Sequence, residues 1–453
     1  MATDPFLHST TTRSHEMKSS TRFLAFAPVL ALAVLGMTAC GRKSDSGASA
    51  NGSSGPVEIK FLHKWPQPVN MAYFEGVVKA FETANPNIKI KMEAVADEPI
   101  KDKLRVLMGS DSQPDIYFSW SGEFAKKFVS SSNAFDLTEA LNADPGWKDS
   151  IMKAGLEPFT FNNKNYGIPL RINGKFFVYN KTLFAKYKLS EPQTWDQFMS
   201  TCETLKKNGV VPIAFGNITP WAACHYLTGL NQKWVPQEVR EKDYDPKNGE
   251  FTDPGYIKAL QYFKNLNDKG YFNKGVNSTE HNMMVETFAQ GKQAMMYVEL
   301  EEFQDVNTKM AGKPWGFFPL PSIENAPGNQ KFLTGAPDGF MVSAKTKHPQ
   351  EAIAFLKFLT NKENSAKLVS TLGWPSPVIG AVNSSNAPDF LVKGMEAIQK
   401  AEGMALWLDT DINIKISDIY LPDLQELLNG KKTPQQIMKE VQDAARQVAS
   451  ETK

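Results

Sequence analysis

Residues 57–92, VEIKFLHKWPQPVNMAYFEGVVKAFETANPNIKIKM, change their hydrophobic period twice. The apolar residues of 57–61 alternate with polar ones, which is the period of a half-buried strand. Within 74–81 they recur at i, i+3, i+4 and i+7, the spacing of a helix that packs one face on a sheet. The segment 85–87 (NPN) interrupts the chain, and 88–92 alternate again. The stretch therefore predicts a strand, a covering helix and a second strand.

The same rhythm continues along the chain. Residues 104–108 predict another helix and 114–118 another strand. Farther on, 194–197 (TWDQ) fits a capping box for a helix through Leu205, 211–215 predict a buried strand, and 352–359 an amphipathic helix. Strands that alternate with helices are typical of parallel sheets covered on both faces. The predicted fold class is α/β.

Composition and length narrow the functional classes. About 400 residues of foldable sequence are enough for two domains. A hydrophobic content of 42% is ordinary, and a net charge of +1 gives no reason to expect nucleic acid as a partner. The sequence has no phosphate-binding loop, no Gly-x-Ser-x-Gly elbow and no His/Cys cluster with zinc spacing. We therefore expect no metal and no cofactor.

Residues 17–39 have the order of a secretory signal peptide. Lys18 and Arg22 form a basic start, 23–37 are almost entirely apolar, and 38–39 are small. The apolar run is shorter than the roughly 20 residues of a membrane span. Cys40 follows the small pair directly, which predicts a lipoprotein signal with Cys40 acylated. Because Met37 stands where such signals more often carry leucine, an ordinary signal peptide with an incidental cysteine is the alternative.

The segments on either side of the signal differ from it in composition. Residues 1–16 include Asp4 and Glu16, which suit neither a signal nor a fold, and we expect a misassigned or non-native leader before Met17. Residues 41–55 contain no apolar side chain larger than alanine, so 40–56 are predicted to be a lipidated cysteine and a flexible tether. This arrangement predicts an exported protein anchored to the cell surface or to the periplasmic face of a membrane.

Two further cysteines, Cys202 and Cys224, lie in the foldable sequence. Exported proteins meet an oxidising environment, so the two thiols could form a disulfide. Two buried free thiols are an equally good interpretation, because spacing alone does not show that the sulfur atoms meet.

Six segments in order resemble family 1 of the extracellular solute-binding proteins. They are the strand and helix of 57–82, QPDI at 113–116, YGIP at 166–169 before VYNK at 178–181, FAQGKQAM at 288–295, 335–339 with the helix at 349–359, and LNGKKT at 428–433. They extend over essentially all of 57–453. Within the family the chain is similar to the carbohydrate-binding members that bind maltodextrins. Family members capture a solute outside the membrane and deliver it to an ABC importer.

The resemblance implies a two-lobed, type II periplasmic-binding-protein fold, in which each lobe is a sheet flanked by helices. It places residues 57–170 plus 335–378 in the N-terminal lobe and 171–334 plus 379–453 in the C-terminal lobe. Three hinge crossings would lie near 170–176, 334–340 and 378–382. A sugar would bind in the cleft between the lobes and favour their closure, and the importer's permease subunits would recognise the closed form. We expect a monomer that requires no covalent chemistry.

Candidate sugar contacts in the first lobe follow its strands. Sugar sites combine flat aromatic rings with planar hydrogen-bonding groups. His63 and Trp65 come after the first strand, in a loop that contacts ligand in the family, and the alternative is that Trp65 packs in the core. Trp120 and Glu123 occupy the next such loop, where relatives place an aromatic and a charged contact, although a surface glutamate is the common case.

The hinge supplies three more candidates. Arg171 and Asn173 point the same way by strand alternation. Asn173 stands where the maltodextrin-binding relatives have a glutamate that contacts sugar. Arg171 is compatible with a ligand contact or with a structural ion pair across the hinge. Asp338 lies between Pro337 and Gly339, where the backbone can approach the cleft closely.

The second lobe contributes the remaining candidates. Asn217 and Trp221 follow a buried strand, and Pro220-Trp221 aligns with a Pro-aromatic pair that stacks on sugar in relatives. Glu299 and Glu301 replace a glycine and a stacking aromatic, so they either bind sugar hydroxyls or cap the following helix. Trp374, which precedes Pro375, is another candidate. Trp407, Asp409 and Asp411 come before the C-terminal helices, and the two aspartates could bind sugar hydroxyls or cap the next helix.

Several tryptophans among these candidates favour a disaccharide or short oligosaccharide over a monosaccharide. Two other functions remain as alternatives: a surface lipoprotein that senses or adheres to carbohydrate without transport, and a glycoside-active enzyme. The enzyme is the weaker alternative, because Glu299 and Glu301 lie on one short segment and do not resemble carboxylates that flank a glycosidic bond.

Overall fold

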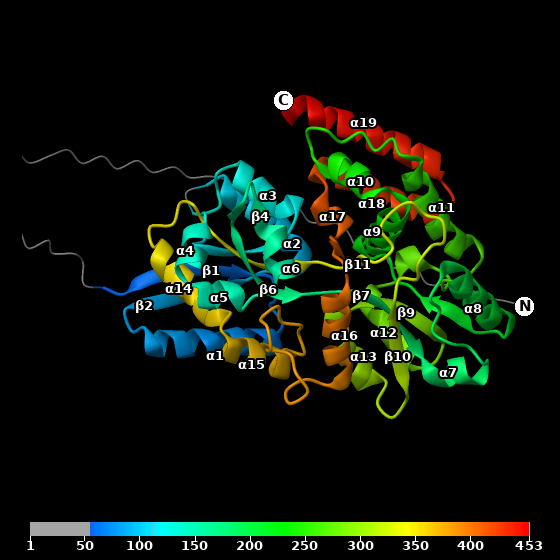
Figure 1. The fold of residues 1–453 in the computed structure, drawn as a ribbon, viewed down its shortest axis with the longest axis horizontal. Helices are drawn as coiled ribbons and strands as arrows, with labels where there is room; N and C mark the ends of the chain where they lie inside the picture. The colour runs from blue at the N-terminus through cyan, green and yellow to red at the C-terminus, as the bar shows by residue number, and fades with distance from the viewer. Residues whose placement is uncertain (1–54, 111, 453) are drawn as a thin grey trace, which may run out of the picture. The chain divides into compact units, whose positions relative to one another are not determined.

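The computed structural model describes residues 55–110 and 112–452. The predicted leader, the signal peptide, Cys40 and nearly all of the tether lie outside the described residues. Within the described part of the chain, no helix is long and apolar enough to cross a membrane. Figure 1 shows the chain with its helices and strands labelled.

A five-stranded sheet is built mainly from the first part of the chain. Its order is β2 (Ile88–Ala94), β1 (Val57–His63), β3 (Ile116–Trp120), β12 (Pro337–Val342) and β6 (Gly167–Ile172). β1 pairs in parallel with β2 and β3. β12 comes from much later in the sequence and runs antiparallel to both of its neighbours. We call this sheet and the helices packed on it the first lobe.

The helices of the first lobe bury the predicted apolar stripe. In α1 (Pro68–Ala84), Phe74, Val77 and Phe81 are buried against the sheet. Proline at the first turn suits the helix start, and the amide of Asn85 closes the end by donating to the Phe81 carbonyl. α1 lies beside α15 (Lys362–Leu372), as Figure 1 shows. α2 (Asp97–Met108), α3 (Glu123–Ser130) and α14 (Pro349–Leu359) join the same core.

A four-stranded sheet forms the centre of the second lobe, in the order β10 (Trp315–Pro319), β7 (Lys175–Asn180), β9 (Gln293–Glu299) and β8 (Val211–Ala214). Alternate side chains of β7 and β9 enter two separate cores: Phe177 and Tyr297 face one, whereas Phe176 and Val298 face the other. This alternation follows from the pleat of a strand.

Helices cover both faces of the second sheet. One core receives α8 (Trp195–Lys207), α9 (Trp221–Trp234), α11 (Pro254–Asp268), α18 (Ile414–Leu428) and α19 (Pro434–Thr452). The other receives α12 (His281–Ala289), α13 (Phe303–Lys309) and α16 (Asp389–Lys400). The predicted capping box is confirmed, because the Thr194 hydroxyl accepts from the Gln197 amide and the Gln197 side chain accepts from the Thr194 amide.

The expectation of parallel sheets is wrong in part. Both sheets are mixed: β12 is antiparallel in the first, and β7 runs antiparallel to β9 and β10 in the second, where only β8 and β9 are parallel. The local pattern of a strand does not report its direction. The direction of a strand is set here by long connections, which bring β12 and β10 back to pair with strands from much earlier in the sequence.

Segments distant in the sequence meet where the chain passes between the sheets. The Asn173 amide donates to the Ala336 carbonyl, the Ile172 amide to Pro375 and the Gly335 amide to Ala405. β11 (Leu333–Thr334) pairs in parallel with β13 (Met404–Ala405). Gly335 suits this crossing, because a Cβ there would lie 2.1 Å from the Asn173 carbonyl oxygen.

The disulfide alternative is wrong: Cys202 and Cys224 are both buried free thiols. Cys202 lies on α8 within the core, and Cys224 lies on α9, where its sulfur is 3.8 Å from Asp409 Oδ1. Burial raises the pKa of both thiols well above the ordinary value, so they behave as small apolar side chains.

Candidate functional site

A cavity of about 290 Å³ lies where segments of both lobes converge, near the lower end of the range for ligand pockets. Ten of the fifteen residues predicted from the sequence line it: Trp65, Trp120, Arg171, Asn173, Trp221, Glu299, Glu301, Asp338, Trp407 and Asp409. We call this space the main cavity. The structure thus brings most of the candidates together, while their contact with ligand stays a prediction.

Arg171 is the central cation of the main cavity. Its guanidinium donates two hydrogen bonds of 2.8 Å to Asp338 and forms an ion pair with Glu301. Its side chain is 4% exposed, so the pairing takes place largely away from water. Glu301 also accepts from Asn173 Nδ2 at 3.1 Å. The structural ion pair predicted for Arg171 is therefore present, and its contact with ligand stays a prediction.

Lysine ammonium groups lie over the ring of Trp120. Lys64 Nζ is 4.7 Å and Lys101 Nζ 5.2 Å from its centroid, within cation–π range. Lys64 also pairs with Asp97 at 2.6 Å and with Asp338 at 3.8 Å. The indole of Trp65 stacks on Phe74, with Arg171 5.0 Å from its centroid. Trp65 is therefore both a core residue and part of the wall, and these neighbours leave it little room to stack on a sugar.

Trp221 begins α9 and is the half-buried member of the predicted aromatic set. Lys175 Nζ lies 5.1 Å from its ring centroid, and His225 and His281 pack beside it. Lys175 is 1% exposed and contacts His225 Nδ1 at 3.0 Å and Glu299 at 3.6 Å.

The indole of Trp407 stacks on the imidazole of His225 with centroids 4.2 Å apart. Burial and the neighbouring Lys175 lower the pKa of His225 well below its ordinary value, so its ring is neutral at pH 7. A neutral imidazole can accept a hydrogen bond from the lysine ammonium.

Of the two interpretations of the glutamate segment, the helix cap is present, and binding of sugar hydroxyls stays a prediction. Glu299 caps the short helix Leu300–Glu302 through a capping box with Glu302, and it also lines the main cavity. The Glu299 amide donates to Glu302 Oε2 at 2.7 Å. Burial acts to raise the pKa of Glu302, but the charge of and hydrogen bond from His281 at 2.8 Å, the charge of Lys175 and the Glu299 amide together lower it to about 2. Burial instead raises the pKa of Glu299.

Sequence reasoning missed several residues of the main cavity. Asp97, Glu98 and Lys101 come from the start of α2, and His281 and Asn282 come from α12. The start of α2 could have been predicted from the sequence, because acidic residues followed by Pro99 are typical of a first helical turn. Nothing in the local pattern of His281 or Asn282 indicated that α12 approaches a helix from the other lobe.

Five predicted residues do not line the main cavity, and three of them are buried elsewhere in the fold. His63 is 0% exposed and packs between the rings of Phe61 and Phe74. Trp374 is buried in the first-lobe core beside Trp65. Asn217 is fully buried, where it accepts from the Ala223 amide and donates to Asn277. His63 and Asn217 were predicted from their positions after strands, but both side chains are fully buried in the structure.

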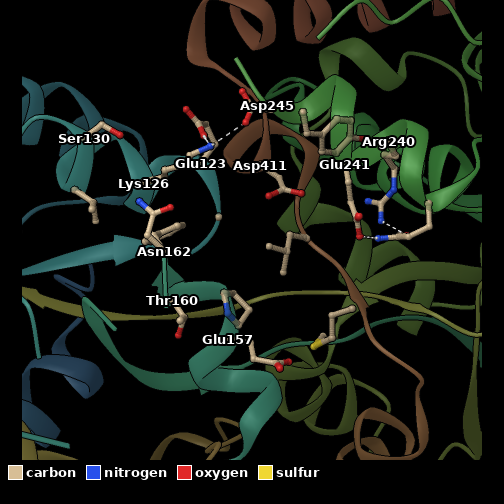
Figure 2. A pocket seen from close by; sticks show the side chains of 18 residues that line it. Glu123, Lys126, Ser130, Glu157, Thr160, Asn162, Arg240, Glu241, Asp245 and Asp411 are labelled. Atoms are coloured by element: carbon tan, nitrogen blue, oxygen red, sulfur yellow. Dashed lines mark hydrogen bonds and ion pairs between the residues drawn. The ribbon is translucent and has the colours of Figure 1, made fainter. Parts of the chain in front are cut away.

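Glu123 and Asp411 line a second cavity of about 620 Å³. Figure 2 shows the Asp411 carboxylate between the α3 residues Glu123 and Lys126 and the α10 (Gln237–Tyr244) residues Arg240 and Glu241. Lys126 links the two sides, at 3.5 Å from Glu123 and 3.8 Å from Asp245. Burial raises the pKa of Glu123 to about 7, against the opposing effect of Lys126, and raises that of Asp411 to about 6.

We expect the Glu123→Gln variant to be more stable than the parent protein above pH 7. Because the folded-state pKa of Glu123 is raised, an ionised Glu123 is penalised in the folded protein, and stability is lost as pH rises through about 7. The gain at pH 8 should be about 1–3 kcal/mol in the free energy of unfolding and should vanish near pH 4. Urea unfolding at both pH values measures it. Glu139→Gln, at an exposed position on α4 (Thr138–Ala143), is the control and should change stability little at either pH.

Comparison with known proteins gives concordant matches. The sequence model described as bacterial extracellular solute-binding protein matches residues 65–366. A multiple sugar-binding protein from Streptococcus mutans is 26% identical over 328 residues, which are 70% of this chain and 74% of that protein. An arabinooligosaccharide-binding protein from Bacillus subtilis is 25% identical over 89% of this chain and 90% of its own.

The fold matches solved structures over nearly their whole length. A chitin oligosaccharide binding protein superposes with a TM-score of 0.79 at 24% identity, covering 87% of this chain and 99% of its own. The expected α/β class and two-lobed, type II architecture are confirmed by this likeness.

Proposed function

Because this chain belongs to the family of bacterial extracellular solute-binding proteins, we propose that it captures a sugar in the main cavity and delivers it to an ABC importer. The sugar is a disaccharide or short oligosaccharide. The sugar-binding functions of the Streptococcus mutans and Bacillus subtilis relatives support a sugar as the solute. Binding and release need no covalent step, so the residues of the cavity act as contacts and not as catalysts.

The observation that carries this proposal is the composition of the main cavity. The half-buried indole of Trp221 lines the cavity together with carboxylates and amides from both lobes and with two lysines from the first lobe. An aromatic face accepts the C–H face of a sugar ring, and planar polar groups accept and donate to its hydroxyls. Asn173, with its amide already paired to Glu301, offers both kinds of hydrogen bond at the hinge.

Delivery would use closure of the two lobes around the solute. We place the lobes at 57–170 plus 335–378 and at 171–334 plus 379–453, with crossings near 170–176, 334–340 and 378–382. A sugar that contacts Trp120 on one lobe and Trp221 on the other binds the closed arrangement better, which shifts the population toward it. The importer would distinguish loaded from empty protein by that difference.

Acylation at Cys40 would complete the mechanism by keeping the protein beside its importer. A single lipid chain on a soluble protein binds a membrane weakly, and a lipoprotein cysteine that carries more than one chain binds stably. The tether of residues 41–55 would let the lobes move freely at the membrane surface.

Two measurements test this function. Calorimetry with the purified protein should detect binding of at least one member of a panel of neutral di- and trisaccharides. Deletion of the chain in its host should then abolish uptake of that same sugar. Uptake that stays intact would support a sensing or adhesive lipoprotein instead. Binding of only an amino acid, a peptide or a phosphate ester would overturn the sugar assignment.

A further inference from the structure

The main cavity contains more carboxylates than cations. Seven carboxylates line it, whereas three lysine and arginine side chains do: Lys64, Lys101 and Arg171. Each of these cations lies within 4.0 Å of at least two carboxylates. A fourth cation, the buried Lys175, pairs with Glu299. The cations are therefore already engaged, and the cavity keeps an excess of negative charge.

Asp409 is the carboxylate with the weakest pairing inside the cavity wall. Its side chain is 9% exposed, its Oδ2 lies 3.9 Å from Lys101 Nζ, and its Oδ1 accepts a long contact of 3.8 Å from the Cys224 thiol. The distance to Lys101 exceeds that of a charge-assisted hydrogen bond, which is about 2.7–2.9 Å, and a thiol is only a weak donor. A carboxylate nine-tenths removed from water and so loosely paired is poised to receive a charged donor.

The surroundings of the Lys101 ammonium show which chemical group can bind next to Asp409. Its ammonium lies 3.2 Å from Glu98, 3.9 Å from Asp409 and 5.2 Å from the centroid of Trp120. Carboxylates and an aromatic face together form an environment for a primary ammonium group. Lys101 reaches this environment from the start of α2, and Asp409 also lines the main cavity, where a ligand would lie.

We propose that the main cavity selects sugars that carry a protonated amino group, with Asp409 as the receiving carboxylate, over neutral sugars of the same size. It disfavours anionic sugars such as uronates and sugar phosphates, because they add like charge to a cavity that is already negative. This inference rests on the proposed function and names the class of sugar that the site takes.

One disaccharide scaffold in three charge states tests the proposal. The β-1,4-linked glucosamine disaccharide is cationic, its N-acetylated form is neutral, and its N-sulfated form is anionic. We expect calorimetry at pH 6.5 and low salt to rank their affinities in that order, with about tenfold or more between the first two. Equal affinity of the cationic and neutral forms, or tighter binding of the anionic form, would overturn the proposal.

A matched pair of variants identifies the receiving group. Asp409→Asn keeps the shape of the side chain and should reduce the affinity for the cationic disaccharide about tenfold while changing that for the neutral form less. Asp102→Asn, at an exposed position on α2 outside the cavity, should change neither. Equal loss for both disaccharides in Asp409→Asn would contradict the assignment. Failure of the cationic disaccharide to bind, in a protein that binds another neutral sugar, would overturn the charge selection and leave the proposed function standing.

Discussion

Replacing Arg171 by methionine should lower the free energy of unfolding by about 3–5 kcal/mol, the largest effect that we expect from one substitution. The guanidinium pairs with Asp338 on β12 and with Glu301 beyond β9, and its side chain is 4% exposed. Methionine fills a similar volume but leaves both carboxylates without their main partner. Uncompensated charge at a buried position is costly because water does not solvate it. Denaturant unfolding measures the loss.

The control for Arg171 is an arginine that pairs with an aspartate at a solvent-exposed position. Arg105 pairs with Asp102 on the exposed face of α2, where both side chains are more than two-thirds exposed. Arg105→Met should change stability by less than about 1 kcal/mol. The double variant Arg171→Met, Asp338→Leu should recover part of the loss, because it removes one of the stranded carboxylates. A loss no larger than that of Arg105→Met would show that the network does not stabilise the fold.

Replacing Trp221 by alanine should weaken sugar binding by about 1–3 kcal/mol, which is about fivefold to 150-fold in affinity. Trp221 is half-buried at the first turn of α9, so removal of its indole takes away ligand surface more than core packing. The loss in folding stability should be small by comparison. Calorimetry with the bound sugar and a thermal melt of the empty protein separate the two effects.

Trp234 is the matched control, because it lies at the other end of the same helix and packs on Tyr262. It does not line the main cavity. Trp234→Ala should lower the melting temperature and leave the affinity unchanged. If Trp221→Ala instead loses as much stability as Trp234→Ala and keeps its affinity, Trp221 is a packing residue.

Much of the fold could be predicted because its elements are local. The alternation of 57–61 became β1, the stripe at 74–81 became the buried face of α1, and the TWDQ segment became the cap of α8. Each depends on side-chain spacing within one turn or one pleat. The direction of β12 and the mixed nature of both sheets could not be read in this way, since pairing joins strands more than a hundred residues apart.

The candidate site was predicted in outline for a different reason. Loops that follow strands converge on one region in this fold, so Trp120 and Trp221 were found from their positions. The same rule placed His63 there, although its side chain is fully buried among the rings of the first-lobe core. Position after a strand fixes where the backbone lies, whereas packing against neighbouring rings fixes which way the side chain points.

The sequence by itself determined the elements of 57–92, the α/β class and the residue types available for a sugar site, because these follow from periodicity and composition. Only the tertiary structure decided how charge is distributed among them. It paired Arg171 with Asp338 and Glu301, placed Lys64 and Lys101 over Trp120, and left Asp409 loosely held. The physical reason is that electrostatic and stacking energies depend on distances between side chains, and those distances join segments that the sequence keeps far apart.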